Sequence, residues 1–97
     1  MAIWPVNIVG NPATFVAPLQ PNAPVGTVYA AQNDVVFWNN TTTQNHQISL
    51  LKDTPAKGVV TPGHQTDALV VTDNPGTTIA YQCVLHPLET GVVIVTN

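Results

Sequence analysis

The sequence predicts an all-β fold, a Greek-key β-sandwich or barrel of seven or eight strands formed by a single domain over residues 1–97. Nine prolines and six glycines punctuate the chain, and no stretch between them keeps the apolar spacing of a substantial helix. Short runs rich in Val, Ile, Thr and aromatic residues recur instead. Hydrophobic residues make up 44% of the chain, so one core can be filled.

Four of the expected strands lie in the first half of the chain: IWPVNIV at 3–9, a stretch near TFVAPL at 14–19, VYAA at 28–31 and DVVFWNN at 34–40. NP and PN dipeptides supply turns between them. The second half adds HQISLL at 46–51, DALVVT at 67–72, TIAYQC at 78–83 and GVVIVT at 91–96, with PG and DNPG turns. In an antiparallel sandwich of this kind, the ends of different strands meet at one pole.

The alternation within residues 78–83 places one chemically distinctive side chain. A strand period of two puts Ile79, Tyr81 and Cys83 on the same face. If Ile79 faces the core, the thiol of Cys83 does so too. Cys83 is the only cysteine, which excludes an internal disulfide and leaves a thiol that is buried, reactive or bound to a metal.

Charged residues are scarce, and their scarcity excludes several classes of function. They make up 7% of the chain, with two lysines, no arginine and a net charge of -3, so no basic track for nucleic acid is available. No apolar run approaches the roughly 20 residues needed to cross a bilayer. The opening MAIWPVNIVG lacks the charged region and long apolar core of a secretory signal. We therefore expect no nucleic-acid partner and no membrane span.

The sequence also offers few residues placed for the common catalytic motifs of enzymes. Ser49 is the only serine and lies inside an expected strand, which leaves little room for a Ser-His-Asp triad. The five acidic residues are scattered, without a pair placed for acid and base work, and no glycine-rich phosphate loop is present. We therefore expect a protein that is not an enzyme.

One segment concentrates metal-binding side chains. YQCVLHPLETG at 81–91 gathers Cys83, His86 and Glu89, the only glutamate. Singly, they are ordinarily a buried thiol, a loop histidine and a solvated carboxylate. However, the strand DVVFWNN is followed by a polar loop and His46, a second imidazole 37 positions before Cys83. Two imidazoles and one thiolate, with a weaker axial ligand, form the donor set of copper electron-transfer sites.

The spacing of these residues suits a shared ion. Cys83 is held at the end of a strand, and the two-residue step at 84–85 turns the chain so that His86 can reach the same ion. Pro87 stiffens the return into the last strand. His46 comes from a neighbouring strand, so a metal would tie separate parts of the fold together.

Taken together, VVFWNNTTTQNHQI and PGTTIAYQCVLHPLETGVVIVTN resemble the cupredoxin family, in particular its plastocyanin-like and amicyanin-like members. The resemblance implies an eight-stranded Greek-key sandwich carrying one type 1 copper ion, with His46, Cys83 and His86 as equatorial ligands. It implies a one-electron carrier, cycling between Cu(II) and Cu(I), that docks transiently with a redox partner protein in the periplasm or outside the cell. We also expect a monomer.

The sequence departs from this family at the axial ligand. Members with a short ligand loop generally carry a methionine three residues after the second histidine, and here that position is Glu89. The only methionine is Met1, which we do not expect to fold over the site. A hard, anionic oxygen should favour Cu(II) over Cu(I), lower the reduction potential and draw the metal toward a tetragonal geometry. Such a site is expected to be red or green rather than blue.

The surroundings of the ligands differ from the family as well. The residue after the first histidine is commonly an asparagine that ties the two ligand loops together, whereas here it is Gln47. The position after the cysteine is Val84, which has no hydroxyl to form a hydrogen bond with the side chain at position 47. The link between the ligand loops is therefore in question, and such outer hydrogen bonds tune both potential and ligand orientation.

An apolar rim is expected around the exposed edge of His86, formed by Leu85, Pro87 and Leu88. In plastocyanins an aromatic residue before the cysteine marks a remote electron port, but here that position is Gln82. The His86 edge is then the remaining port. An apolar rim on a protein of low charge favours brief, weakly oriented docking over electrostatic capture.

Two other functions remain open from the sequence. Strong binding by Glu89 with an open position would give a red copper site for a small molecule such as nitric oxide. Alternatively, two histidines, a cysteine and a glutamate suit tetrahedral zinc, and the domain would then be a non-redox metal-binding or metal-free module. His64, in TPGHQTD, has only a turn context and is expected in a surface loop.

Overall fold

The computed structural model describes residues 1–51 and 58–97. No α-helix forms in these two ranges, which instead contain eight strands. The strands are β1 Ile3–Val9, β2 Thr14–Val16, β3 Thr27–Ala31, β4 Val35–Asn40, β5 Ile48–Leu50, β6 Leu69–Val70, β7 Thr78–Cys83 and β8 His86–Thr96. The predicted all-β fold is confirmed.

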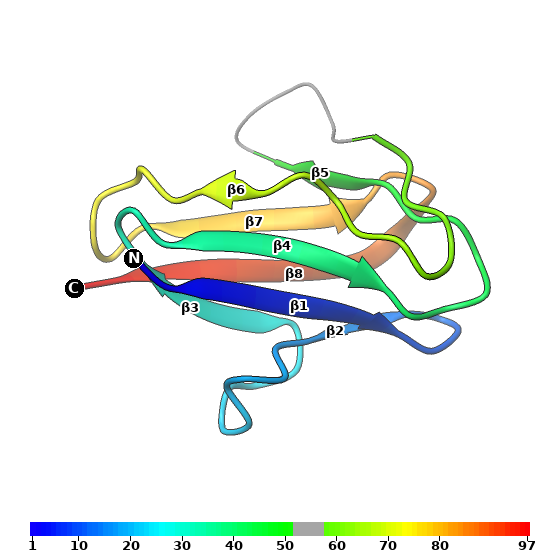
Figure 1. Ribbon diagram of the computed structural model, residues 1–97, viewed down its shortest axis with the longest axis horizontal. Helices are drawn as coiled ribbons and strands as arrows, with labels where there is room; N and C mark the ends of the chain where they lie inside the picture. Colours follow the sequence, from blue (N-terminus) through cyan, green and yellow to red (C-terminus); the bar gives the residue numbers. More distant parts are fainter. Residues whose placement is uncertain (52–57) are drawn as a thin grey trace.

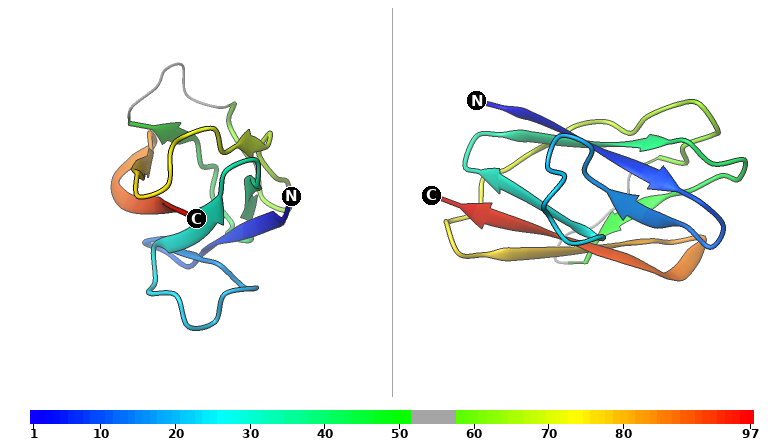
Figure 2. Two further views of the ribbon diagram at one scale, coloured as in Figure 1. Left: turned by 90° about the vertical axis from the view of Figure 1, so that its left-hand side faces the viewer. Right: turned by 90° about the horizontal axis from the view of Figure 1, so that it is seen from below.

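The strands form two sheets that pack face to face, with orders β2-β1-β4-β6 and β3-β8-β7-β5. Figures 1 and 2 show the two layers running along the long axis of the molecule. Both sheets are mixed rather than antiparallel throughout, because β1 pairs with β4 and β3 pairs with β8 in parallel. Parallel pairs arise because crossover connections between the sheets bring strands that are distant in sequence side by side with the same direction.

Four expected strands differ in extent from the structure by more than one residue. The stretch expected near 14–19 ends at Val16. The last strand begins at His86 rather than at 91, since His86 pairs with Cys83 directly after the turn at 84–85. The strands expected at 46–51 and 67–72 are shorter, at Ile48–Leu50 and Leu69–Val70. Both are edge strands of their sheets. An edge strand has one neighbour only, so its ladder ends as soon as that neighbour diverges.

The core lies between the two sheets and is centred on three aromatic residues. Phe15 and Tyr81 meet edge to face with ring centroids 4.9 Å apart, and Trp38 and Tyr81 do so at 5.0 Å. Trp38 comes from one sheet and Tyr81 from the other, so this cluster fastens the sheets together. Ile79, Tyr81 and Cys83 are all buried, which confirms that one face of β7 turns inward.

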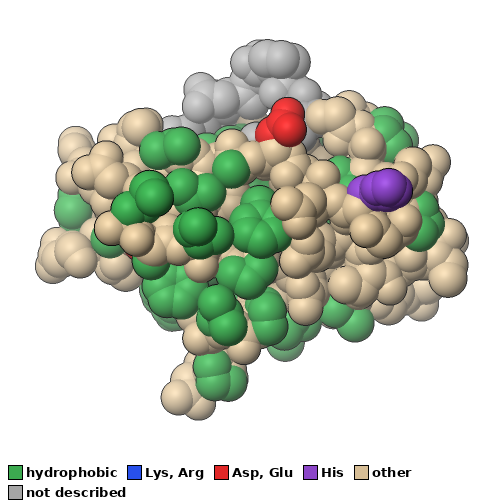
Figure 3. All heavy atoms as spheres, in the orientation of Figure 1, with side chains coloured by type: hydrophobic (Ala, Val, Ile, Leu, Met, Phe, Trp, Pro, Cys, Tyr) green, Lys and Arg blue, Asp and Glu red, His purple; other side chains and the backbone are tan. Residues whose placement is uncertain are grey.

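The ligand-bearing turn and the chain termini lie at opposite ends of the sandwich. Figure 1 shows both termini at one end and the turn from β7 into β8 at the other, which we call the Cys83 pole. Figure 3 shows a face covered mostly by hydrophobic and uncharged polar side chains, as the low charge content requires. Among the described residues, none forms a helix long and apolar enough to cross a membrane.

Candidate metal centre

Four side chains converge at the Cys83 pole: His46, Cys83, His86 and Glu89. Each contributes one donor atom, and these atoms all lie within 4.8 Å of one another. His46 Nδ1 lies 3.4 Å from Cys83 Sγ, and His86 Nδ1 lies 3.6 Å from the same sulfur. Glu89 Oε1 lies 3.2 Å from His46 Nδ1 and 3.5 Å from His86 Nδ1. The structure thus brings together all four residues that the sequence singled out.

The turn from β7 into β8 positions three of these residues. Cys83 ends β7 and pairs with His86, while Gln82 pairs with Thr90, so residues 87–89 form a bulge in β8. A bulge re-directs side chains that a regular ladder would place on the other face. Here it leaves Leu88 98% exposed and buries Glu89, which is 7% exposed, beside the thiol.

His46 reaches the cluster from an irregular segment that precedes β5. Its backbone exchanges hydrogen bonds with Val60, His46 N donating to Val60 O at 3.1 Å and Val60 N donating to His46 O at 2.7 Å. Two residues later Ile48 pairs with Cys83, at the junction of β5 and β7. This register places the imidazole beside the thiol, although the expected strand beginning at 46 starts only at Ile48.

Backbone amides contribute two of the hydrogen bonds that join the two ligand loops. The Val84 amide donates to the Gln47 carbonyl at 2.7 Å, and the Gln47 amide donates to Cys83 Sγ at 3.4 Å. The identity of the side chains at 47 and 84 therefore does not break the link that the sequence left in question. An amide donor on the sulfur also disperses thiolate charge and so tunes a bound metal.

The ring of His46 is oriented by a buried polar network. Its Nε2 lies 3.0 Å from Thr42 Oγ1, and the Thr42 hydroxyl donates to Asn40 Oδ1 at 2.7 Å. Asn40 in turn donates its amide to the carbonyls of Gln44 and Val60, at 2.7 and 2.8 Å. Since the single hydroxyl proton is engaged with Asn40, Thr42 accepts the Nε2 proton of His46. The unprotonated Nδ1 then faces the other three donors.

Glu89 has two oxygens in different surroundings. Oε2 accepts a hydrogen bond from the backbone amide of Ala13 at 2.8 Å. Oε1 is buried without an aligned hydrogen-bond partner in the described part of the chain, although both imidazole Nδ1 atoms lie close to it. A buried carboxylate oxygen without a hydrogen-bond donor is costly. Its position among two imidazoles and a thiol fits a metal ligand.

Burial and charge act in opposite directions on His46. Burial lowers the pKa of His46, because a charged imidazolium loses its hydration there, and the neighbouring carboxylate of Glu89 partly opposes that effect. A neutral imidazole is the form that ligates metals. The chemistry of the four donors therefore fits a copper or zinc ion, with softer donors in Cys83 and the histidines and a hard oxygen in Glu89.

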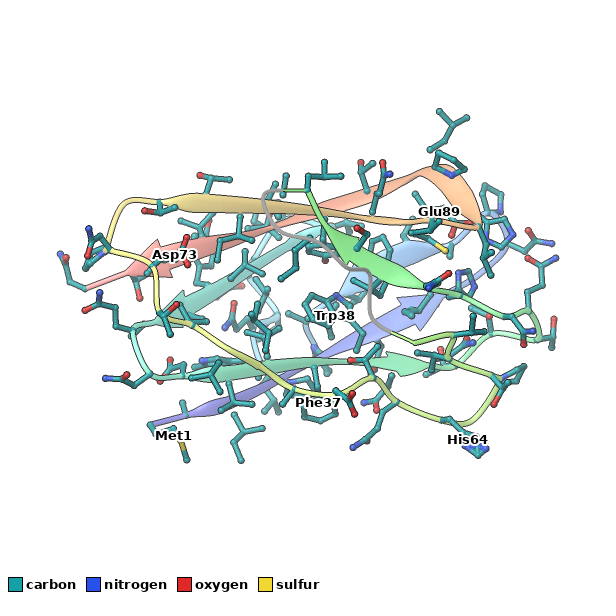
Figure 4. The ribbon with its side chains drawn as sticks, turned by 90° about the horizontal axis from the view of Figure 1, so that it is seen from above. Met1, Phe37, Trp38, His64, Asp73 and Glu89 are labelled. Atoms are coloured by element: carbon teal, nitrogen blue, oxygen red, sulfur yellow. The ribbon has the colours of Figure 1, made fainter. Side chains whose placement is uncertain are left out.

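The partly exposed edge of the cluster is His86, and the other residues that the sequence singled out lie beside the cluster or away from it. The side chain of His86 is 36% exposed, and Leu85 and Leu88 beside it are 47% and 98% exposed. His64 is an exposed turn residue that points outward, as expected. Figure 4 shows Met1 at the opposite end of the molecule from Glu89, so the only methionine is remote from the site.

Sequence reasoning missed three residues that support the ligands. Asn40 and Thr42 lie in the polar stretch before His46, and their type alone suited a loop equally well. Ala13 contributes only a backbone amide, for which a sequence carries no side-chain signal. A Thr four residues before a candidate ligand histidine is a usable signal in retrospect, since its hydroxyl can form a hydrogen bond with Nε2 of the ring.

A two-layer sandwich with two histidines and a cysteine gathered at one pole defines a cupredoxin-like architecture. No protein-family model and no curated protein matches the chain. Solved structures of amicyanin do match it. The Cu(I) form of a methionine-to-alanine mutant aligns with a TM-score of 0.70 at 18% identity, covering 94% of this chain and 79% of that one.

Two further amicyanin structures give similar values. An oxidized methionine-to-lysine mutant aligns with a TM-score of 0.73 at 19% identity and the same coverage of 94% and 79%. An oxidized proline-to-alanine mutant aligns at 0.64 and 20% identity, covering 72% and 69%. At such identities the likeness establishes the fold. The chain has the cupredoxin fold, and the resemblance inferred from its motifs is confirmed at that level.

Proposed function

We propose that the protein is a mononuclear copper protein that carries single electrons and is not an enzyme. The observation that supports this function is the group of two imidazoles, one thiol and one carboxylate within 4.8 Å at one pole of a cupredoxin fold. His46, Cys83 and His86 would be the principal ligands, and Glu89 would ligate through Oε1. A bound copper ion supplies one-electron chemistry between Cu(II) and Cu(I).

The polypeptide contributes rigidity to this chemistry. The Thr42 hydroxyl fixes the ring of His46, and the Gln47 amide fixes the sulfur of Cys83. Donors held in place before and after electron transfer keep the reorganisation of the site small. The buried position of Cys83 and His46 also excludes water from one side of the site.

Charge balance predicts a preference for the oxidised ion. A thiolate from Cys83 and a carboxylate from Glu89 neutralise a divalent ion, whereas a monovalent ion leaves one net negative charge at a buried site. The sequence has only Lys52 and Lys57 as basic residues besides histidine, and both lie outside the described residues. Because an uncompensated buried charge is unfavourable, we expect a lower potential than with an uncharged axial ligand.

Electrons would pass through the partly exposed edge of His86, where Leu85, Pro87 and Leu88 form an apolar rim. This rim suits brief docking to a redox partner protein. We propose that the protein acts as a monomer, as residues 1–97 of one domain, in the periplasm or outside the cell. The resemblance to cupredoxins supports this location.

Cu(II) titration of the metal-free protein tests the proposal. We expect an intense thiolate-to-copper absorption band, an electron paramagnetic resonance signal from one Cu(II) site, and a reversible one-electron wave in voltammetry. Glu89→Met should turn the site bluer and raise its potential. His64→Ala, which alters an exposed histidine outside the cluster, should leave both unchanged. Absence of the band, or tight zinc with no retained copper, would exclude the carrier.

A second candidate is a copper site that binds a small molecule. A hollow of about 370 Å³ beside the site is lined by Asn11, Pro12 and residues 85–89, which include His86 and Glu89. Such a hollow gives a small neutral molecule or anion an approach to the ligands. Azide or nitric oxide that shifts the Cu(II) spectrum would favour this function, and an unchanged spectrum would favour the carrier.

A further inference from the structure

The turn between β1 and β2 lies against the metal-binding bulge of β8. Val9 and Thr14 are the last paired residues of these strands, so residues 10–13 form the connection. Gly10 begins the turn with a φ of 85°, a conformation that glycine adopts without steric cost. Ala13 ends the turn and precedes the first residue of β2 that pairs with β1. Its amide is therefore available to the Glu89 carboxylate, 76 positions away in the sequence.

We propose that the backbone amide of Ala13 positions Glu89 as a metal ligand through one oxygen only. This inference rests on the proposed function and adds a positioning role for the β1–β2 turn. The amide occupies Oε2 at 2.8 Å and leaves Oε1 facing His46 Nδ1 and His86 Nδ1. Both Ala13 and Glu89 are buried, at 6% and 7% exposed, so water does not compete freely for this hydrogen bond.

The amide decides how the carboxylate can bind. A free carboxylate can turn and offer both oxygens to one ion, whereas a carboxylate with one oxygen fixed offers only the other. A backbone donor is also fixed in direction by the turn that carries it, unlike a flexible side chain. The β1–β2 turn would therefore select which oxygen of Glu89 is offered to an ion.

Replacing Glu89 by glutamine makes the orientation of the side chain at position 89 depend on the Ala13 N–H. An amide side chain has one accepting and one donating end. With the Ala13 N–H present, the introduced carbonyl oxygen must face Ala13, and the introduced NH₂ group then faces the other donors, where it cannot ligate. Without the Ala13 N–H, the introduced amide is free to turn and present its oxygen to the ion.

The test compares Cu(II) and Zn(II) binding by the full chain in two backgrounds, Glu89 and Glu89→Gln. Ala13→Pro removes the N–H, and Ala13→Gly retains it as the matched control. With Glu89 present, we expect Ala13→Pro to weaken Cu(II) binding roughly 10-fold to 100-fold and to alter the electron paramagnetic resonance spectrum. With Glu89→Gln present, Ala13→Pro should strengthen Cu(II) binding. Ala13→Gly should do neither.

Three outcomes are decisive. A reversal of sign between the two backgrounds supports the positioning role, because general damage to the turn would weaken binding in both. Equal losses of Cu(II) affinity in both backgrounds, or no change in either, overturn the positioning role of Ala13 but do not contradict the proposed copper function. If the unaltered chain binds no Cu(II), the proposed function fails, and the positioning role fails with it. Should Ala13→Pro not fold, replacement of Ala13 by lactic acid, which converts the amide to an ester, removes the same N–H.

Discussion

The Thr42 hydroxyl lies 3.0 Å from Nε2 of His46 and fixes which nitrogen of that ring faces the other donors. Thr42→Val preserves the shape of the side chain and removes the hydroxyl. The ring then loses its acceptor for Nε2–H and can rotate or change tautomer. We expect metal affinity to fall roughly 10-fold to 100-fold, as for other hydrogen bonds behind metal-bound histidines, measured by competition with a chelator of known affinity.

Thr42→Ser is the matched control, because it retains the hydroxyl and its bond to Asn40. We expect it to bind copper nearly as well as the unaltered chain. An equal loss in Thr42→Ser and Thr42→Val would show that packing of the methyl group, rather than the hydrogen bond, supports His46.

Gly91 lies against the ring of Tyr81, and this contact sets a second prediction. A Cβ built on Gly91 overlaps Tyr81 Cζ and the hydroxyl, and it approaches Gly26 O at 2.8 Å. Gly91→Ala therefore overpacks the region beside β7. We expect a loss of about 1–3 kcal/mol in the free energy of unfolding, measured by chemical denaturation of the metal-free protein.

Gly58→Ala provides the comparison, since no atom of residues 1–51 or 58–97 lies within 4 Å of a Cβ built at Gly58. Its free energy of unfolding should change by no more than about 0.5 kcal/mol. If Gly91→Ala were as stable as Gly58→Ala, Tyr81 would have to move aside without cost, contrary to its position between Phe15 and Trp38.

The sequence predicted the features of this fold that local patterns encode. Alternation within residues 78–83 correctly placed Cys83 on the buried face, and the ligand spacing correctly brought His86 to Cys83 across a two-residue turn. The parallel pairing of β1 with β4 was not predictable in this way. Which strands become neighbours depends on contacts between segments far apart in the chain, and no local pattern reports them.

Some parts of the candidate site could likewise be predicted from the sequence and others could not. His46 and Glu89 could be proposed because their side chains have ligand chemistry. The amide of Ala13 and the carbonyl of Gln47 could not, since every residue but proline offers both groups regardless of its side chain. The bulge at 87–89, which buries Glu89, likewise depends on the pairing of Gln82 with Thr90.

Asp34 carries the third prediction, which concerns acid stability at the opposite pole. Its carboxylate accepts hydrogen bonds from the Ala2 amide, the Trp4 indole and the Ala31 amide, at 2.8, 2.9 and 2.9 Å. These bonds, that from Ala2 foremost, lower the pKa of Asp34 below its usual value of 3.8. A lowered pKa contributes stability above pH 3.8, and that contribution is lost as the pH falls through the lower folded-state pKa.

Asp34→Asn places an NH₂ group against these donors, so we expect a loss of at least about 1 kcal/mol at neutral pH. The difference between the two proteins should shrink as the pH falls below 3.8, because protonated Asp34 loses the same advantage. Denaturation curves at several pH values measure it. A difference that grows on acidification would contradict the assigned role. Asp67→Asn, at an exposed acidic residue, corrects for the general effect of removing one negative charge.

The proposed electron transfer through the His86 edge can be tested without knowing the partner, because a copper carrier would exchange electrons with its own copies. Leu88 is 98% exposed beside His86, and Leu88→Asp sets like charges opposite each other whenever two rims meet. We expect self-exchange, measured by nuclear magnetic resonance line broadening in mixtures of oxidised and reduced protein, to slow at least about tenfold at low salt. High salt should partly restore it.

Val70→Asp adds the same charge at another exposed position, 52% exposed in β6 of the other sheet and away from the Cys83 pole (Figure 1). Because both variants raise the overall negative charge equally, any difference between their rates reports the location of the port. If self-exchange is slow in Leu88→Asp and fast in Val70→Asp, two copies of the protein meet at the apolar rim. Equal rates would mean that two copies approach through another surface, and electrons would then have to leave the site by a route other than His86.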